Sequence, residues 1–504
     1  MSKTIDKEKN FSIPKEVLAV LDVLKKNKFE AFVVGGSVRD LILGLEPGDW
    51  DVTTNATPEE LVKIFPDSFY ENKFLTVTVK TGSDDPRLSE VEITTYRAEG
   101  RYSDQRHPDE VRYAKTLEED LSRRDFTVNA MALGVTSDKR QATRSYEVID
   151  PFDGQKDLEK KIIRTVGTPK ERFGEDALRM LRAVRIATEL KFSIEEKTKA
   201  AIREHAAWIK VIAGERIRDE LAKMFSSPYS SKGVELLEDV GLLQFIMPEL
   251  REGIDVGQNK HHIYTVWEHN TRALAWADKE KYAVPVKIAA LLHDVGKPRC
   301  KVGDGPDSTF YQHDVVGAKM AAVMLERLHF PREIISKVVR LIRWHLFKYD
   351  PNEGITDSAI RRLIRRVEPE NIDDLVLVRI CDRMGSGVPK AVPYRLRHFQ
   401  FRVEKILREE EAPTPKMLAI DGTDVMRILS IPPGPKIGFI LAALLEEVID
   451  EPQKNSKDYL TSRLAELNQL SIEELKKLAE SAESKVELVE DEREAGLKDK
   501  YYVK

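Results

Sequence analysis

Two short apolar segments near the start of the chain flank residue types that bind phosphate and metal ions. Residues 29–34 read as a buried strand, and the pair Gly35-Gly36 that follows lets backbone N–H groups approach a ligand closely, because neither residue carries a Cβ. Asp49 and Asp51 then open a second predicted strand. Side chains alternate along a strand, so we expect the two carboxylates to lie side by side on one face. This pattern restricts the first part of the chain to an α/β unit whose strand ends carry polar groups.

The paired carboxylates indicate a metal-dependent reaction on a phosphate. Two hard oxygen ligands that lie close together suit Mg²⁺. The glycine turn can bind phosphate, and Arg39 lies one turn into the helix that we expect after it. A phosphate-binding turn next to a paired-carboxylate metal site predicts nucleotidyl transfer.

The chain has 504 residues, which is too long for one hydrophobic core, so we expect several domains. Strand and helix patterns mix in the first 150 residues, and beyond a turn at 150–154 the chain is almost wholly helical. The predicted fold class is α+β, with an α/β head before an all-α region. The predicted parts are a head at 1–150, a helical neck at 151–230, a helical body at 231–395, a C-terminal helical segment at 396–470 and a charged tail at 471–504.

Composition restricts the cellular location that we expect for the protein and the partners that it can bind. The start of the chain is polar and charged, and no apolar run reaches the roughly 20 residues that a membrane helix needs, so we expect no membrane association. Two cysteines make no disulfide framework, and we expect a cytoplasmic protein. The net charge of −5 argues weakly against nucleic-acid binding. However, Lys and Arg outnumber Asp and Glu at 156–223 and at 332–410, where a polyanion could bind or where charged helix faces are simply solvated.

Further downstream, the segment RRDFTVNAMA places Arg124 beside a buried-looking Phe126-Thr127-Val128. An arginine held in this way could clamp a triphosphate with bidentate geometry, although a structural salt bridge is the more common role of such a residue. Its position downstream of the glycine turn and the aspartate pair favours the functional interpretation.

Residues 173–185 are predicted to form one helix with acidic residues in its first turn. In such a helix Asp176 and Arg179 are one turn apart on one face, and an acceptor next to a forked donor can mimic the pairing edge of a base. Arg182 and Arg185 rotate away from that face, so we assign them to phosphates or to the packing of the helix. An ordinary salt-bridged helix would show the same spacing.

Taken together, these motifs resemble a known family. The segments GGSVRD with DWD, RRDFTVNAMA, DPFDGQKDL and EDALRMLRAVR follow one another in family order, and GERIRDEL at 214–221 and residues 418–438 match further elements. The chain is similar to the class II tRNA nucleotidyltransferases, the CCA-adding enzymes, which are close kin to bacterial poly(A) polymerases. The resemblance implies a polymerase β-like catalytic head, a neck that recognises the base, and a body and tail that bind tRNA.

The resemblance also implies roles for individual residues. Mg²⁺ would be held by Asp49 and Asp51, and two metal ions would assist the attack of the tRNA 3′-hydroxyl on the α-phosphorus of CTP or ATP. Glu92, on a neighbouring predicted strand, is a further candidate carboxylate, although an exposed strand glutamate is more common. The implied nucleotide-binding residues are Gly36, Arg39 and Arg124 for the triphosphate, Asp176 and Arg179 for the Watson–Crick edge of C or A, and Arg182 and Arg185 to complete the pocket.

The segment 96–111 resembles the flexible loop of the family, which enzymes that add only CC typically lack. The arginine-rich signature of poly(A) polymerases is not evident at 71–81. The sequence therefore favours full CCA addition and leaves open addition of only the terminal A.

A second constellation lies between residues 261 and 382. Adjacent His and Asp at a helix end, with a distant His and Asp, can hold one or two metal ions for phosphoester hydrolysis. This region resembles an HD domain of the metal-dependent phosphohydrolase superfamily. Its minimal ligand set is His269, His293, Asp294 and Asp382, with His313 and His345 nearby in sequence.

Three functions are consistent with the sequence. The first is the addition of CCA to tRNA. The second is a phosphohydrolase acting on cyclic nucleotides or RNA termini, with a divalent metal of unknown identity in the HD domain. The third is an RNA-binding protein without catalysis. The oligomeric state is not predicted.

Overall fold

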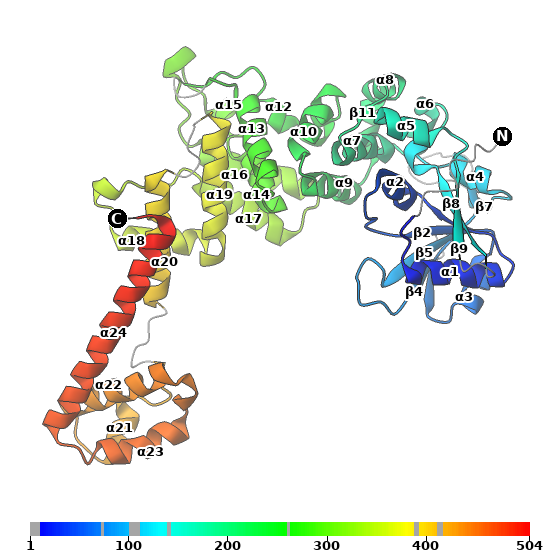
Figure 1. Cartoon of the computed structure of the whole chain (residues 1–504). Helices are drawn as coiled ribbons and strands as arrows, with labels where there is room; N and C mark the ends of the chain where they lie inside the picture. Colours follow the sequence, from blue (N-terminus) through cyan, green and yellow to red (C-terminus); the bar gives the residue numbers. More distant parts are fainter. Residues whose placement is uncertain are drawn as a thin grey trace. The chain divides into compact units, whose positions relative to one another are not determined.

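A computed structural model describes residues 11–71, 75–99, 111–138, 143–259, 263–387, 393–410 and 417–503 (Figure 1). The chain forms two compact units. The first consists of Met1–His345 with Leu377–Pro389, and the second of Leu346–Val376 with Lys390–Lys504. Among the described residues, no helix combines the length and apolarity that a membrane crossing requires.

The head contains a seven-stranded sheet with the order β3-β4-β5-β2-β1-β8-β9. Strand β1 is antiparallel to β2 and β8, whereas β2 is parallel to β5. The predicted strand at 29–34 and the one that Asp49 and Asp51 open are present as β1 and β2, and the strand predicted to carry Glu92 is β5. The strands are β1 (Ala31–Val34), β2 (Asp51–Thr54), β3 (Ser68–Glu71), β4 (Thr76–Lys80), β5 (Glu90–Thr95), β8 (Ala132–Asp138) and β9 (Thr143–Ile149).

Short helices connect these strands. Helix α3 begins with a capping box, in which the side chains of Thr57 and Glu60 each accept a hydrogen bond from the other's backbone N–H. Helical patterns in the sequence at 15–27 and 58–64 predict α1 and α3 to within one residue. The head helices are α1 (Lys15–Lys26), α2 (Gly36–Leu43), α3 (Pro58–Ile64), α4 (Leu117–Ser122) and the 3-10 turn η1 (Thr127–Asn129).

The segment at 96–111, which is predicted to be the flexible loop of the family, begins and ends in a small ladder. Strand β6 (Arg97–Glu99) pairs with β7 (Val111–Tyr113) in antiparallel fashion. Residues 100–110, which carry the centre of that prediction, lie outside the described residues.

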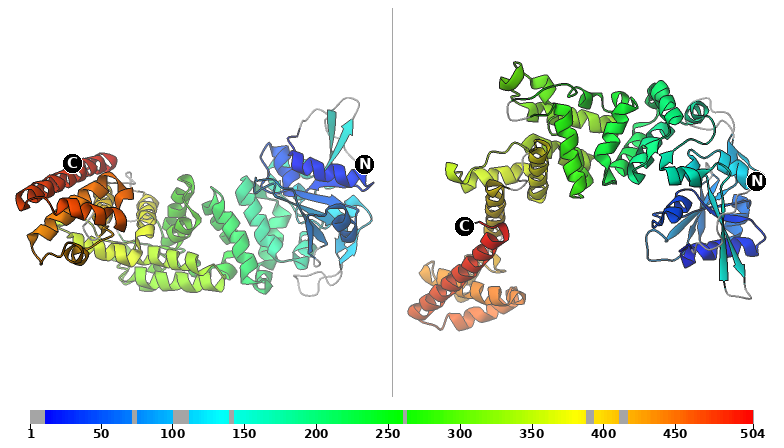
Figure 2. Two further views of the ribbon diagram at one scale, coloured as in Figure 1. Left: turned by 90° about the horizontal axis from the view of Figure 1, so that it is seen from below. Right: turned by 45° about the horizontal axis from the view of Figure 1, so that its top comes forward.

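Beyond residue 150 the first unit is largely helical, as predicted. Helices α10 and α13 pack against each other and so do α9 and α14, which joins the neck to the helices that follow it. Both views of Figure 2 show this region in shades of green. The elements of the neck are α5 (Gly154–Lys160), β10 (Ile162–Ile163), α6 (Pro169–Glu175), α7 (Leu178–Leu190), β11 (Ser193–Ile194), α8 (Glu196–His205), η2 (Ala206–Val211), α9 (Gly214–Ser226) and α10 (Ser230–Asp239). The elements that follow are α11 (Leu243–Ile246), α12 (Pro248–Arg251), α13 (Val266–Lys279), α14 (Val284–Leu292), α15 (Lys297–Cys300), α16 (His313–Arg327), α17 (Arg332–Trp344) and α19 (Ile372–Gly385).

The second unit is helical and has its own core. Leu444, Leu460 and Leu464 are fully buried in one cluster, and Leu475 at the start of α24 joins them. The sequence from about Ser471 is charged and poor in aromatic residues, which predicts a tail only loosely tied to a core, and this prediction is wrong at the start of α24. The helices are α18 (Asp357–Val367), α20 (Tyr394–Glu410), α21 (Gly422–Leu429), α22 (Pro435–Asp450), α23 (Lys457–Leu467) and α24 (Ile472–Tyr501).

Candidate functional site

The aspartate pair lies at the start of strand β2. Asp51 is the first residue of the strand, and Asp49 precedes it in a bend. Burial and the nearby Asp49 raise the pKa of Asp51 to about 6, and Arg124 only partly opposes this effect. Exposed Glu92 lies opposite Asp51 on β5 and also raises its pKa. The protein therefore supplies too little positive charge to balance these carboxylates. A divalent cation such as Mg²⁺, which prefers hard oxygen ligands, would balance them.

The glycine turn between β1 and α2 packs against the Asp51 carboxylate. Gly35 has φ of 79°, and a Cβ on it would lie 3.1 Å from a guanidinium nitrogen of Arg124 and 3.2 Å from Oδ2 of Asp51. Gly36 is the first residue of α2 and is not in the left-handed region. Backbone conformation and space therefore require glycine at 35, whereas the sequence prediction named Gly36 as the contact residue.

The two head arginines predicted to meet the triphosphate are both anchored by side chains of the head. Arg39 donates to both carboxylate oxygens of Asp40, at 2.8 and 3.0 Å, and to Oδ1 of Asn129 at 2.9 Å. Arg124 forms an ion pair with buried Asp120 at 3.5 Å. The structure thus places Arg124 next to the glycine turn and Asp51, and it ties Arg39 to η1.

The prediction of one helix across residues 173–185 is wrong. Helix α6 ends at Glu175, Asp176 is extended with φ of −144° and ψ of 108°, and α7 begins at Leu178. The Asp176 carboxylate accepts a hydrogen bond from the backbone N–H of Leu178 at 3.0 Å. Short polar side chains offer the backbone such an alternative to helix bonding, which explains the break. The apolar stripe predicted for this region is nevertheless buried.

The break also changes the partners of the predicted base-reading pair. Oδ2 of Asp176 lies 2.7 Å from a guanidinium nitrogen of Arg216 on α9. Arg179 donates to Glu175 and, at 3.2 Å, to the carbonyl oxygen of Arg172. Asp176 is therefore oriented by Arg216, whereas Arg179 is oriented by Glu175 and the carbonyl oxygen of Arg172.

Arg182 and Arg185 on α7 are paired with buried acids. Arg182 donates to Asp125 at 2.8 Å, and Arg185 donates to Glu220 at 2.5 Å. Although burial opposes it, Arg182 and then Arg179 lower the pKa of Asp125 to about 2. Sequence reasoning did not single out Asp125, Arg216 or Glu220 as functional. The signal was present, because Asp125 lies in RRDFTVNAMA, and the other two lie in GERIRDEL.

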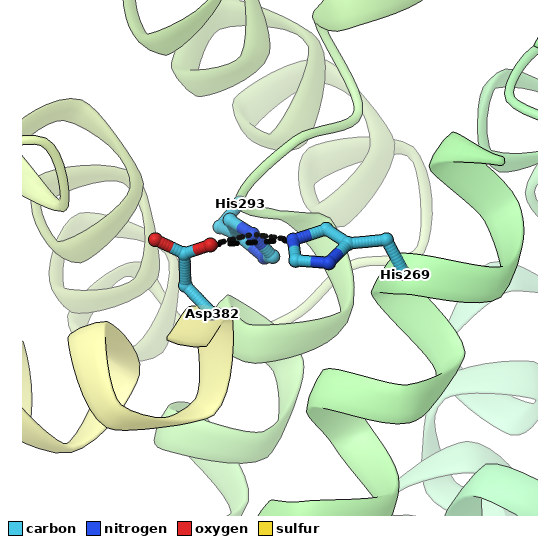
Figure 3. A group of neighbouring side chains, drawn as sticks. All are labelled: His269, His293 and Asp382. Atoms are coloured by element: carbon cyan, nitrogen blue, oxygen red, sulfur yellow. Dashed lines mark hydrogen bonds and ion pairs between the residues drawn. The ribbon is translucent and has the colours of Figure 1, made fainter. Parts of the chain in front are cut away.

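The second constellation forms a buried centre in the first unit. His269 comes from α13, His293 caps α14, and Asp382 comes from α19, and the three side chains point toward one another (Figure 3). Nε2 of His269 lies 3.0 Å from Nε2 of His293 and 3.3 Å from Oδ1 of Asp382. Asp294 adds Oδ2 at 3.2 Å from the same atom of His269. The structure therefore brings together all four residues of the predicted ligand set.

Three histidines of this centre are oriented in the same way. The Nδ1 atoms of His293, His313 and His345 lie 2.8, 2.6 and 2.7 Å from the backbone carbonyl oxygen three residues earlier. A proton on Nδ1 leaves Nε2 with a free lone pair, the form that binds a metal ion. Burial lowers the pKa of His345 to about 3, which keeps its ring neutral. Although burial opposes it, Asp294 and Asp382 raise the pKa of His293 to about 10, so without a metal ion this ring carries a second proton on Nε2. A divalent cation would displace that proton, and the donor set of the centre fits such a cation.

The sheet with its carboxylates and the buried His/Asp centre together define a nucleotidyltransferase-type head joined to an HD domain. Family models match the chain in the same order. They are the "Poly A polymerase head domain" at residues 31–164, the "Probable RNA and SrmB- binding site of polymerase A" at 191–254, the "HD domain" at 262–385 and the tRNA nucleotidyltransferase domain 2 at 395–464.

Individual proteins agree with these models. The chain is 31% identical to the CCA-adding enzyme of Geobacillus kaustophilus, over 90% of this chain and 97% of that one. It is 35% identical to the A-adding tRNA nucleotidyltransferase of Deinococcus radiodurans, over 66% of this chain and 75% of that one. A crystal structure of the Bacillus stearothermophilus CCA-adding enzyme in complex with CTP matches with a TM-score of 0.55 and 28% identity, over 90% of this chain and 97% of that one. The chain belongs to the class II CCA-adding tRNA nucleotidyltransferase and poly(A) polymerase family.

Proposed function

We propose that this protein adds or repairs the 3′-terminal CCA of tRNA from CTP and ATP without a nucleic-acid template. The observation that carries the proposal is that the Asp51 carboxylate and the Arg124 guanidinium both lie beside Gly35, where a triphosphate and a metal ion would meet. The match over nearly the whole length of a CCA-adding relative supports this reaction, and the A-adding relative supports the alternative that only the last nucleotide is added.

In this reaction the 3′-hydroxyl of tRNA attacks the α-phosphorus of the nucleotide, a phosphodiester bond forms, and pyrophosphate leaves. Asp49 and Asp51 would hold Mg²⁺, which when bound neutralises charge on the phosphates and assists both the attacking and the leaving oxygen. The backbone at Gly35 and Gly36 approaches the triphosphate at the start of α2, where N–H groups are free to bind anions.

The side chains around this turn complete the nucleotide pocket. Arg39 and Arg124 bind the phosphates, and Asp176 with Arg179 reads the base. Arg182 completes the pocket and Arg185 supports it, since buried Asp125 and Glu220 hold the two guanidinium groups in place.

We assign a role to each segment of the chain. Residues 1–150 carry catalysis, 151–230 recognise the base, 231–395 contain the HD domain, 396–470 bind tRNA, and 471–504 form a charged tail. The two free cysteines, Cys300 and Cys381, support a cytoplasmic setting.

Three substrates test the proposal: tRNA that lacks CCA, tRNA that lacks CA, and tRNA that lacks only A. The protein is incubated with each substrate, Mg²⁺, CTP and ATP, and the products are sequenced. We expect a complete CCA end from all three, no product from Asp49→Ala/Asp51→Ala, and normal product from the exposed control Asp84→Ala. Extension of only the last substrate would make this an A-adding enzyme. Absence of any product, or full activity of the double variant, would refute nucleotidyl transfer at this site.

The buried His/Asp centre supports a second activity, metal-dependent hydrolysis of a phosphate ester. The test uses bis-p-nitrophenyl phosphate and a 2′,3′-cyclic nucleotide with Mn²⁺, Co²⁺, Ni²⁺ or Zn²⁺. Hydrolysis that Asp294→Ala abolishes and Asp51→Ala leaves intact would place the activity in the HD domain. The absence of hydrolysis with every metal would leave the centre as a structural one.

A further inference from the structure

Two arginines of the neck donate to the same end of one head helix. Helix α4 ends at Ser122, and Arg123 caps it. Arg172 on α6 donates to the carbonyl oxygen of Ser122 at 3.0 Å. Arg179 on α7 donates to the carbonyl oxygen of Arg123 at 3.4 Å. The last carbonyl groups of a helix lack partners within it, so these two side chains satisfy them and bond the neck to the C-terminal end of α4.

The same end of α4 continues directly into the residue that is predicted to meet the triphosphate. Arg124 follows Arg123, and buried Asp120 pairs with both guanidinium groups, at 3.5 and 2.8 Å respectively. The Arg124 guanidinium also lies beside Gly35 in the phosphate-binding turn. Residues 122–124 therefore connect the contacts of the neck arginines to the proposed triphosphate site.

Arg172 links Arg179 to this end of α4 through several hydrogen bonds. The Oε2 atom of Glu175 accepts from Arg172 at 3.0 Å and also from Arg179. The carbonyl oxygen of Arg172 accepts a further bond from Arg179 at 3.2 Å. Nε of Arg172 donates to the carbonyl oxygen of Val166 at 3.1 Å, and the side chain of Arg172 is only 14% exposed. One largely buried, forked guanidinium group therefore holds Arg179 and the end of α4 in a single arrangement.

We propose that Arg172 is a positioning residue that couples recognition of the base to placement of the triphosphate. The coupling rests on the proposed function, in which Arg179 reads the base and Arg124 binds the phosphates. Hydrogen-bonded groups that contact two sites can transmit binding energy between them. A matching base holds Arg179 in place, and through Arg172 and residues 122–124 it favours the position of Arg124 that binds the triphosphate. A nucleotide with a mismatched base does not gain this contribution and is transferred more slowly.

The coupling depends on the forked shape of the guanidinium group rather than on its charge. The three nitrogen atoms of the Arg172 side chain donate to acceptors that belong to Ser122, Val166 and Glu175. A lysine at this position would keep the positive charge, but its single nitrogen cannot reproduce the planar geometry. Arg172→Lys should therefore retain much of the stability of the fold and lose most of the coupling.

Binding of the two halves of a nucleotide, measured separately, tests the coupling. Cytidine carries a base without phosphates, and tripolyphosphate with Mg²⁺ carries phosphates without a base. Isothermal titration calorimetry gives the affinity of the full-length protein for tripolyphosphate with and without saturating cytidine. In the wild type we expect cytidine to raise this affinity about tenfold, and by linkage tripolyphosphate should raise the affinity for cytidine by the same factor. Cytidine is uncharged, so direct attraction between the two ligands does not produce the factor.

Variants of Arg172 separate coupling from folding. Arg172→Ala and Arg172→Lys should each reduce the factor to about 1. The ratio of kcat/KM for CTP to kcat/KM for UTP, measured on tRNA that lacks CCA, should fall about tenfold in both variants. Arg203→Ala is the matched control, because Arg203 on α8 also donates to a carbonyl oxygen and a carboxylate, both of Asp239 in the neck. This control should leave the factor and the ratio unchanged.

Cooperative binding and nucleotide incorporation are separate readouts. Absence of cooperativity in the wild type, or unchanged cooperativity in Arg172→Lys with a normal circular dichroism spectrum, would overturn the coupling. A lower thermal midpoint of Arg172→Ala with unchanged cooperativity would mean that Arg172 only stabilises the fold. If Arg172→Ala does not fold, the wild type and Arg172→Lys decide the question. Cooperative binding without incorporation would sustain the coupling and refute nucleotidyl transfer, whereas incorporation without cooperativity would overturn the coupling alone.

Discussion

Asp176, which lies in the break between α6 and α7, forms an ion pair with Arg216 on α9, with 2.7 Å between Oδ2 and the guanidinium nitrogen. The two residues are 40 positions apart. Their side chains are 16% and 32% exposed, so solvent screens the pair only in part. Arg216, together with the backbone N–H of Leu178, therefore orients the carboxylate of Asp176, the proposed reader of the base.

Arg216→Ala should therefore weaken nucleotide selection. We expect KM for CTP and ATP to rise about tenfold, the loss of about one charge-assisted hydrogen bond, with a smaller change in kcat. Arg218→Ala is the matched control, since Arg218 lies on the same helix and pairs with exposed Asp219. Arg216→Lys should recover part of the loss, because it restores the charge and not the fork. An unchanged KM in Arg216→Ala would exclude this positioning role.

Gly35→Ala should abolish most of the transfer activity. The positive φ disfavours any side chain, and the Cβ would press against Arg124 and Asp51. We expect a loss of stability of about 1–2 kcal/mol and a fall in kcat/KM of at least about tenfold. Gly44→Ala separates the two effects, because Gly44 also has positive φ, at 71°, but has open space around it. Equal activity losses in both variants would show that backbone strain, and not contact with the carboxylate, limits the reaction.

Glu220→Gln should loosen the packing of α7 on α9. Glu220 is buried, it accepts from Arg185, and it lies 3.5 Å from Arg182. Removing the charge leaves two arginines under-compensated, and we expect a loss of about 2 kcal/mol, seen as a lower thermal midpoint. Glu189→Gln removes the more exposed partner of Arg185 and should cost less than about 1 kcal/mol. If the two variants are equally stable, burial of Glu220 does not increase its contribution to the stability of the fold.

Local patterns predicted the strands well, and they singled out four His and Asp side chains that the structure brings together in one buried cluster. Residues 31–34 were identified because an apolar run ends at Gly35, and 51–54 because Asp49 and Asp51 open a strand pattern. His293-Asp294 was identified because the pair ends an apolar helix. The break at Asp176 was missed, since helical periodicity does not register a side chain that bonds to the backbone two residues later. Arg216 and Glu220 were missed as partners because ion pairs between helices depend on tertiary packing.

Asp125→Asn should reduce the loss of stability in acid. The pKa of Asp125 is about 2 in the folded protein, against 3.8 ordinarily, so its ionised form stabilises the fold above pH of about 4. That contribution, about 2 kcal/mol at neutral pH, declines as the pH falls toward 2, and about 1 kcal/mol of it is gone at pH 3. The stability gap between wild type and Asp125→Asn should therefore narrow between pH 5 and pH 3.

Urea unfolding midpoints at the two pH values measure this gap. Asp85→Asn is the control, because Arg87 also lowers the pKa of Asp85, but that pair lies in a solvent-exposed turn and should contribute little. A gap that stays constant for Asp125→Asn would mean that Asp125 titrates near its ordinary pKa and that Arg182 is held in place by Glu220 alone. A gap that narrows as expected would establish the Asp125–Arg182 pair as an acid-sensitive link between the head and helix α7, which carries Arg179, the proposed base-recognition residue.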